Sequence, residues 1–431
     1  MTQDLFFKCS HIRLLGWVMM GMIGSMTIAD YAVSEPSQIK SVYNYTDTLP
    51  LGKHGDLLLS TEFKTNIPNA RAWKILYRST DIHNNPVLST GMLIAPTGKV
   101  ALGKRPVVSF AHGTTGIAPI CAPSSIEDPA TDPQMYFYAS TDSRKIMDTG
   151  IPGLSKMIAA GYVVVATDYS GLGAPGLHQY LVGPTAARNT LDAIAAAQKL
   201  SASGSGTKAV VIGWSEGGQA AVWSAEIADY AVNTELLGVV ALAPVNAAEQ
   251  LKIERQVTAS GKKLPAMTDT ETLMAQYASA KTFSDLQLSD VFTPFGIEFM
   301  DEASKHQCSK QMSQSMQYMA GQKGPLSRSD PQNQEAWLKR TEQMGLGNQI
   351  AKVPVAIYQG DDDPTIFPAA TEAYIKKACA NGSNVTYRHY PKTDHLGVVF
   401  SAESDYLSWI ANRFSNRRAT NECHLNLPTK S

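Results

Sequence analysis

Charged residues make up only 17% of this 431-residue sequence, and their signs almost cancel, leaving a formal net charge of −1. A balance this close to neutral provides no electrostatic reason to expect a nucleic-acid partner. The hydrophobic content of 44% is that of an ordinary globular protein. The length allows one large α/β domain with an insertion, or two domains.

Cysteine is scarce as well, with five residues in the chain and no Cys-x-x-Cys pair. The missing pair argues against a structural zinc site, and the chemistry inferred below needs neither a metal nor an organic cofactor. If Cys9 is lost with an N-terminal signal, four cysteines remain: Cys121, Cys308, Cys379 and Cys423. In an exported protein an even number predicts two disulfides, with three possible connectivities.

The sequence contains little that would hold it in a membrane. Lys8 and Arg13 precede an uncharged stretch, residues 14–29, and small residues follow at Ala29 and Ala32. The stretch contains three glycines and is short for a bilayer-spanning helix, which weakens the alternative of an anchoring helix. We therefore expect a signal peptide over residues 1–32, a secreted or periplasmic protein, and no stable membrane insertion.

The most informative stretch is 209–220, where a short apolar run ends in Gly-x-Ser-x-Gly and a small-residue segment follows. This order predicts a strand, a sharp turn and a helix, the nucleophile elbow that exposes a serine hydroxyl. Ser215 would take a strained backbone conformation, so its neighbours Gly213 and Gly217 need to lack side chains. The N–H group of Glu216, at the start of the helix, would point to where an oxyanion forms.

Strand and helix patterns alternate around this elbow. The runs 72–78 and 86–94 predict an antiparallel hairpin at a sheet edge. Helical periodicity marks 184–200 and 402–414. Further apolar runs predict strands at 106–111, 162–167, 237–244, 353–358 and 385–390. Strands that alternate with helices indicate an α/β fold with a mainly parallel sheet and helices on both faces.

A long helical segment separates the strands expected at 237–244 and 353–358. Met312, Met316 and Met319 recur there at helical spacing, a pattern that usually reflects core filling. An insertion at this edge of a sheet, where active sites form, also fits a lid. We expect a core of residues 33–246 and 347–431, and a mostly helical cap or lid at 247–346.

A serine nucleophile needs a base to take its proton and a third group to orient that base. In this architecture the chain order is serine, acid, histidine. His395 follows the last expected strand and is the favoured base. His389 lies within that strand, and His112 belongs to a different loop.

Three consecutive aspartates follow the strand at 353–358. Asp363 precedes Pro364 in the middle of the loop and is the first choice for the acid. Asp361 and Asp362 fit solvated turn residues and remain alternatives, and Asp168, on an earlier strand, is an outside candidate.

The oxyanion needs a second N–H donor besides Glu216. His112, Gly113 and Thr114 follow the early strand at 106–111, where this architecture places its other donor. Gly113 allows close approach, and the N–H group of Thr114 is the expected donor, with Thr115 as the alternative. The same glycine also fits an ordinary turn.

With these pieces in place, the chain resembles the secretory lipase family of the α/β-hydrolase superfamily, which includes the fungal lipase A type enzymes. The resemblance spans about residues 55–415 and is weakest in the middle insertion. It rests on these stretches: Tyr77-Arg78-Ser79, His112-Gly113-Thr114-Thr115-Gly116, Cys121-Ala122-Pro123-Ser124, Asp168-Tyr169-Ser170-Gly171-Leu172-Gly173, Gly213-Trp214-Ser215-Glu216-Gly217-Gly218, Gly360 to Pro364, and Asp394-His395.

This resemblance implies an α/β-hydrolase fold with a helical cap, and a catalytic triad of Ser215, Asp363 and His395. It implies disulfides Cys121–Cys308 and Cys379–Cys423, the first tying the cap to the main domain. The implied activity is hydrolysis of carboxylic esters, including triacylglycerols. We expect a small-molecule or lipid ester as substrate and a lipid–water interface as a further partner. An acyltransferase or peptidase on the same scaffold, or a non-catalytic binding protein, is the alternative.

Overall fold

A computed structural model provides the structure of this protein. It describes residues 41–424 apart from 44, 46–48, 50, 99–102, 134–149, 232 and 261–268. The signal peptide expected over residues 1–32 lies outside the described residues. In the part of the chain that is described, no helix is long and apolar enough to cross a membrane.

The described residues form one nine-stranded sheet in the order β1-β2-β3-β5-β4-β6-β7-β8-β9. The first three strands pair antiparallel, β3 is antiparallel to β5, and every later pair is parallel. The mainly parallel sheet predicted from the sequence is therefore confirmed. The strands are β1 (Leu57–Phe63), β2 (Ala70–Thr80), β3 (Pro86–Pro96), β4 (Arg105–Ala111), β5 (Val163–Ser170), β6 (Ser205–Trp214), β7 (Glu235–Leu242), β8 (Val355–Gly360) and β9 (Val385–Tyr390).

The hairpin of β2 and β3 is present, but its expected place at the sheet edge was wrong. Strand β1 pairs with β2 from Leu57↔Tyr77 to Phe63↔Ala72 and is itself the edge. Strand β1 is not evident in the sequence because its residues are half-buried or exposed and show no clear alternation of apolar and polar side chains. This segment is extended because its backbone pairs with that of β2, and not because its own sequence pattern favours a strand.

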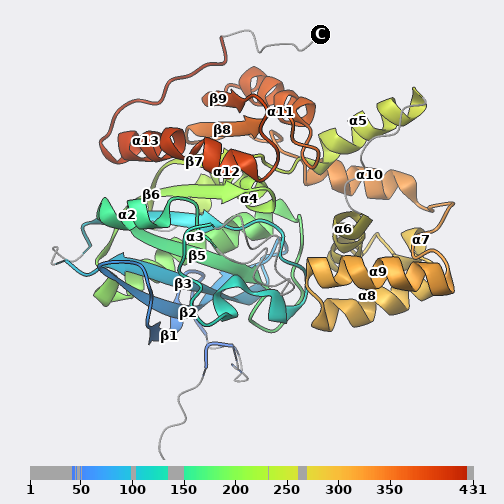
Figure 1. Ribbon diagram of the computed structural model, residues 1–431, viewed down its shortest axis with the longest axis horizontal. Coiled ribbons are helices and arrows are strands. Elements are labelled where there is room, and N and C mark those ends of the chain that lie inside the picture. Colours follow the sequence, from blue (N-terminus) through green and yellow to red (C-terminus); the bar gives the residue numbers. More distant parts are fainter. Residues whose placement is uncertain are drawn as a thin grey trace, which may run out of the picture. The chain divides into compact units, whose positions relative to one another are not determined.

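Helices cover both faces of the sheet (Figure 1). Consecutive valines of the central strands point to opposite faces, so Val107 packs in one apolar cluster and Val108 in the other. The face of Val107 is covered by α3 (Gly183–Lys199), α4 (Glu216–Glu226) and α11 (Pro368–Ala380). The face of Val108 is covered by α2 (Leu154–Ala159), α12 (Gly397–Ser401) and α13 (Glu403–Phe414). Burial on both faces explains the continuous apolar runs.

A series of helices follows β7 and precedes β8 along the chain, where the sequence predicts a helical insertion. They are α5 (Ala247–Ala259), α6 (Asp269–Thr282), α7 (Leu288–Val291), α8 (Pro294–His306), α9 (Ser309–Lys323) and α10 (Gln334–Gln343) (Figure 1). Met312 and Met316 are buried in the same apolar cluster as Val108, and Met319 is partly buried against it. The boundaries expected at 247 and 347 stay a prediction.

Candidate active site

Ser215 lies at the turn from β6 to α4, with φ 59° and ψ −117°. This is the left-handed region that a residue with a side chain rarely enters. The two flanking glycines make the turn possible, because a Cβ at Gly213 would lie 1.9 Å from the carbonyl oxygen of Gly217. A Cβ at Gly217 would lie 1.8 Å from the carbonyl oxygen of Ala111. Backbone contact with β7 then holds Ser215, whose N–H group donates to the carbonyl oxygen of Leu242 at 2.9 Å.

His395 follows β9 and Asp363 follows β8, so both lie at the carboxyl edge of the sheet beside Ser215. Nε2 of His395 is 3.0 Å from Oγ of Ser215, and Nδ1 is 2.8 Å from Oδ2 of Asp363. The buried Asp363 accepts at its other oxygen from the N–H groups of Thr365 and Ile366, both at 2.8 Å. These bonds keep the carboxylate turned toward Nδ1.

The other aspartates considered from the sequence have different partners. Asp361 lies 3.2 Å from Nδ1 of His389, and the exposed Asp362 donates its N–H group to the carbonyl oxygen of Thr393. Asp168 is buried on β5, where it accepts from the Thr90 hydroxyl at 2.7 Å and from Ser124. Among the described residues, Asp363 supplies the carboxylate that lies within hydrogen-bonding distance of His395.

Trp214 takes part in the site, although its position inside the Gly-x-Ser-x-Gly pattern carries no signal of this. Its indole Nε1 donates to the carbonyl oxygen of His395 at 3.0 Å. The two rings lie 5.1 Å apart, centre to centre. Trp214 therefore fixes the histidine loop to the strand that carries Ser215.

The loop after β4 lies directly against Ser215. A Cβ at Gly113 would be 2.7 Å from the Trp214 ring and 3.5 Å from Cβ of Ser215. Among the described residues, neither Thr114 nor Glu216 has a hydrogen-bond acceptor for its backbone N–H group. The N–H group of Thr115, the alternative donor, has no acceptor among these residues either, and its carbonyl oxygen accepts from the N–H group of Ser309 at 2.9 Å.

His112 supports this loop from inside the protein. It is buried, and burial lowers its pKa. Its Nδ1 is 2.6 Å from the carbonyl oxygen of Gly113, and its own carbonyl oxygen accepts from the Tyr169 hydroxyl at 2.9 Å. The ring nitrogens of His112 thus face the carbonyl oxygens of Gly113 and Asp168, and neither is bonded to Ser215 or His395.

The inserted helices surround a cavity of about 270 Å³. Its lining includes apolar Leu181, Ala247, Leu251, Ala275, Val291, Trp337 and Leu338 and polar Gln250, Glu254, Arg255, Thr272, Gln276 and Thr341. Gln250 links this cavity to the acid loop, since its amide donates to the carbonyl oxygen of Thr365 at 2.7 Å.

Glu271 brings helix α6 into the electrostatic surroundings of the site. Burial raises the pKa of this carboxyl, and His395 opposes that shift. The start of α6 therefore lies within electrostatic range of His395.

Two disulfides join distant parts of the chain. Cys121 is bonded to Cys308 and Cys379 to Cys423, with Cα–Cα distances of 5.4 and 5.2 Å. This is the pairing that the family resemblance implies. The first bond fastens the start of α9 to the segment that follows the Gly113 loop.

A resident metal would need several His, Cys, Asp or Glu side chains around one point. Within the described residues no group of three or more is arranged in that way. The side chains that do converge can transfer a proton. The Ser215 hydroxyl lies within hydrogen-bonding distance of the His395 imidazole, whose second nitrogen faces the buried carboxylate of Asp363. Such an arrangement suits nucleophilic attack by Ser215.

Comparison with known proteins identifies the family. The model of the secretory lipase family matches residues 146–422, more than half of the chain. The chain belongs to the secretory lipase family. As a member of this family, the protein is a carboxylic ester hydrolase. A curated relative, trichothecene C-3 esterase of Fusarium sporotrichioides, is 22% identical over 374 residues, covering 82% of this chain and 77% of the relative.

Solved structures with the same fold include two esterases or lipases. Candida antarctica lipase A in its closed state matches with a TM-score of 0.68 and 18% identity, over 88% of this lipase-family chain and 86% of that chain. The rice cell wall degrading esterase LipA of Xanthomonas oryzae matches with a TM-score of 0.62 and 19% identity. This match covers 85% of the present chain and 100% of the LipA chain. These likenesses confirm the α/β-hydrolase fold predicted from the sequence.

Proposed function

We propose that this protein is an exported serine esterase or lipase that hydrolyses acyl esters through a Ser215–His395–Asp363 triad and an acyl-enzyme intermediate. The observation that carries the proposal is the unbroken series of contacts from the Asp363 carboxylate through His395 to the Ser215 hydroxyl. Asp363 accepts the Nδ1–H of His395, which leaves Nε2 free to accept the serine proton.

In this mechanism the Ser215 oxygen attacks the ester carbonyl carbon while its proton passes to Nε2 of His395. The N–H groups of Glu216 and Thr114 donate to the oxyanion of the tetrahedral intermediate. When that intermediate collapses, the bond to the alcohol oxygen breaks and His395 protonates the departing alcohol. A water molecule then attacks the acyl-enzyme and loses its proton to His395. As the second tetrahedral intermediate collapses, His395 passes this proton to the Ser215 oxygen and the acid is released. These steps require no cofactor.

The family and the two disulfides support an extracellular location, and we propose that residues 1–32 are the signal that directs it. We further propose that residues 247–346 form a cap over the site, and that the mixed lining of the cavity of about 270 Å³ receives part of the substrate. The named activity of the Fusarium relative favours an acyl ester as the substrate class. Nucleic acid is not an expected partner.

The test compares wild type with Ser215→Ala on a series of p-nitrophenyl esters of increasing chain length and on an emulsified triglyceride. Ser215→Ala should lower kcat by up to about 10⁶-fold. A fluorophosphonate probe should label wild type and leave Ser215→Ala unlabelled. Preference for short soluble esters would make the protein an esterase, and turnover that rises sharply at the emulsion would make it a lipase.

The rival functions give different results. Parallel assays with alcohol acceptors and with peptide substrates would reveal an acyltransferase or a peptidase. Absence of probe labelling in wild type, or labelling that persists in Ser215→Ala, would point to a binding protein that keeps the fold.

A further inference from the structure

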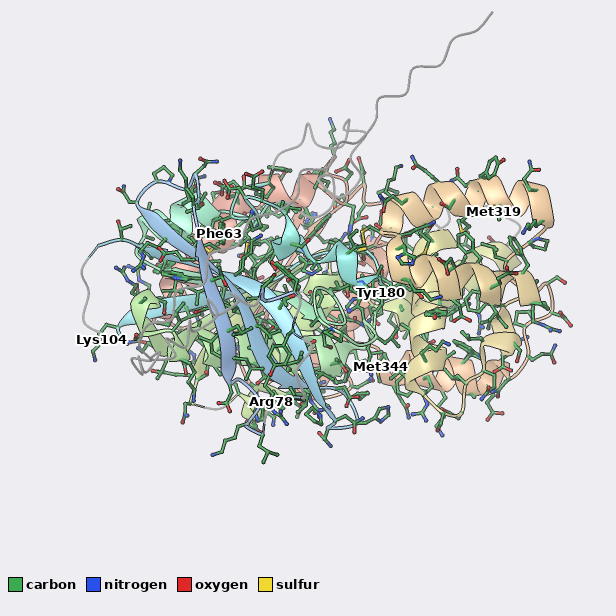
Figure 2. All side chains as sticks on the ribbon, turned by 90° about the horizontal axis from the view of Figure 1, so that it is seen from below. Phe63, Arg78, Lys104, Tyr180, Met319 and Met344 are labelled. Carbon is green, nitrogen blue, oxygen red and sulfur yellow. A yellow bond between two sulfur atoms is a disulfide. The ribbon has the colours of Figure 1, made fainter. Side chains whose placement is uncertain are left out.

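One short segment contacts both residues whose N–H groups we assign to the oxyanion. The segment 178–180 lies in the loop between β5 and α3, and both His178 and Tyr180 are buried. Nε2 of His178 lies 3.0 Å from Oε1 of Glu216. The Tyr180 hydroxyl lies 2.8 Å from Oγ1 of Thr114. In Figure 2, Tyr180 lies where the inserted helices meet the rest of the chain.

We infer the number of protons shared by His178 and Glu216 from the partners of the two ring nitrogens. Nδ1 is 3.3 Å from the carbonyl oxygen of Ser170, which can only accept, so Nδ1 carries a hydrogen. The 3.0 Å contact between Nε2 and Glu216 then needs one further proton, because two lone pairs at this distance repel each other. Whether nitrogen or oxygen holds that proton, the His178–Glu216 pair has no net charge.

This neutrality matters because of where Glu216 lies. Its side chain is 1% exposed, and among the described residues its second oxygen, Oε2, has no hydrogen-bond partner. The same residue begins α4 immediately after Ser215 and would donate its N–H group to the oxyanion. A lone buried carboxylate there would repel the negative charge that develops in the transition state. The proton shared with His178 removes that repulsion.

Close packing surrounds the segment 178–180. A Cβ at Gly171 would lie 2.1 Å from the backbone nitrogen of His178, so the loop closes tightly. The His178 ring stacks on Tyr169 with centres 5.5 Å apart and planes inclined by 15°. Tyr169 in turn donates to the carbonyl oxygen of His112, in the Gly113 loop. Burial raises the pKa of Tyr180 far above its ordinary value, which keeps its hydroxyl neutral beside Thr114.

We propose that His178 and Tyr180 are positioning residues for the oxyanion hole: His178 orients Glu216 and cancels its charge, and Tyr180 orients Thr114. The inference rests on the proposed function, since it assumes that Glu216 and Thr114 stabilise the oxyanion formed by Ser215. It adds two buried residues whose effect falls on the transition state more than on substrate binding.

The experiment measures kcat and KM on a soluble p-nitrophenyl ester for His178→Gln, Glu216→Gln, the double variant His178→Gln/Glu216→Gln, and Tyr180→Phe. Enzyme concentrations come from active-site titration with a fluorophosphonate, so unfolded protein does not count. A second readout is the affinity for an aryl boronic acid, which forms a tetrahedral adduct with an active-site serine. The matched control is His54→Gln, since His54 also pairs with a carboxylate, Asp192 at 2.7 Å, in another part of the protein.

We expect His178→Gln to lower kcat by about 10- to 100-fold, below the loss of about 10²- to 10³-fold that follows removal of a whole oxyanion donor. KM should change by less than about threefold, and boronic acid affinity should fall in parallel with kcat/KM. The double variant should recover about tenfold over His178→Gln because it no longer buries a lone carboxylate, and Glu216→Gln should lose less than His178→Gln. Tyr180→Phe should lose about 3- to 10-fold in kcat.

Unchanged kcat in folded His178→Gln, equal losses in His178→Gln and His54→Gln, or a double variant no better than His178→Gln would each overturn the inference. If His178→Gln does not fold, Tyr180→Phe decides: parallel losses of kcat and boronic acid affinity support the proposal, and values within about twofold of wild type overturn it. Activity that survives Ser215→Ala would instead overturn the proposed function itself.

Discussion

The Asp361 carboxylate lies 3.2 Å from Nδ1 of His389, in parallel with Asp363 and His395, which are 2.8 Å apart. Both pairs join the loop after β8 to β9 or the loop that follows it. They differ in exposure: the imidazoles of His389 and His395 are 41% and 15% exposed, and the carboxylates of Asp361 and Asp363 are 10% and 0% exposed. An exposed pair contributes little to stability, whereas a buried carboxylate can orient an imidazole.

Asp363→Asn should therefore lower kcat by about 10⁴-fold with little change in fold, because the amide favours the wrong tautomer of His395. Asp361→Asn, the matched control, should keep kcat within about threefold of wild type. Both variants are assayed by kcat on a soluble ester and by circular dichroism. The reverse order of the two losses would move the acid assignment to Asp361.

Gly113→Ala tests how closely the loop after β4 must approach Ser215. The added methyl group would lie 2.7 Å from the Trp214 ring, so the loop or the indole has to move. Because the indole also holds the carbonyl oxygen of His395, we expect kcat to fall by about 10²-fold, the loss typical of one misplaced oxyanion donor. Gly176→Ala is a suitable control, since no atom lies within 4 Å of a Cβ there, although its positive φ adds some strain. Wild-type kcat in Gly113→Ala would contradict the proposed role of this loop.

The Cys121–Cys308 bond should matter for activity as well as for stability. It closes a loop of 187 residues, and the adjacent Ser309 donates to the carbonyl oxygen of Thr115 beside the Gly113 loop. Replacing both cysteines by serine should lower the free energy of unfolding by about 2–5 kcal/mol. Urea unfolding and kcat at a temperature below the transition provide the measurements.

The second disulfide, Cys379–Cys423, is the control for that variant. It joins α11 to the C-terminal segment and closes a loop of 44 residues. Its removal should destabilise the protein while leaving kcat near the wild-type value. If kcat also stays near the wild-type value after removal of the Cys121–Cys308 bond, that bond does not help to position the catalytic residues.

His54 should make stability depend on pH. Its Nδ1 lies 2.7 Å from Asp192, and this hydrogen bond raises the pKa of His54 above its ordinary value of 6.5. The folded protein thus binds this proton more tightly than the unfolded chain does. The stabilisation is fully present below about pH 6.5 and is lost as the pH rises through the higher folded-state pKa.

The measurement is the melting temperature of wild type and His54→Gln at about pH 6 and about pH 9. The advantage of wild type over His54→Gln should be larger at the lower pH. An advantage that is equal at both values, or larger at the higher one, would show that the proton on His54 does not stabilise the fold.

Much of the fold could be predicted because its signals are local. Apolar β-branched runs such as 209–213 indicated buried strands, and helical periodicity indicated α3 and α13. Strand β1 was missed because its residues carry no clear alternation, and the pairing with β2 that makes it a strand involves residues 9 or more positions away. Pairing between distant segments is not encoded in a local pattern.

The same contrast holds at the site. Glycines around Ser215 predicted the elbow because steric exclusion within a few residues determines that turn. The contact of His178 with Glu216 was not predicted, since a buried histidine and a glutamate 38 positions apart carry no joint signal. The structure was needed to show that the loop after β5 lies against the elbow.

The sequence by itself determined which residue types stand at the ends of strands, and hence that a serine on a strained turn, an aspartate and a histidine follow parallel strands. Only the tertiary structure decided which aspartate faces His395 and which side chains lie against the two N–H groups beside Ser215. The physical reason is that backbone conformation depends on near neighbours, whereas the position of a side chain such as Asp363 depends on the packing of helices and strands far apart in the chain.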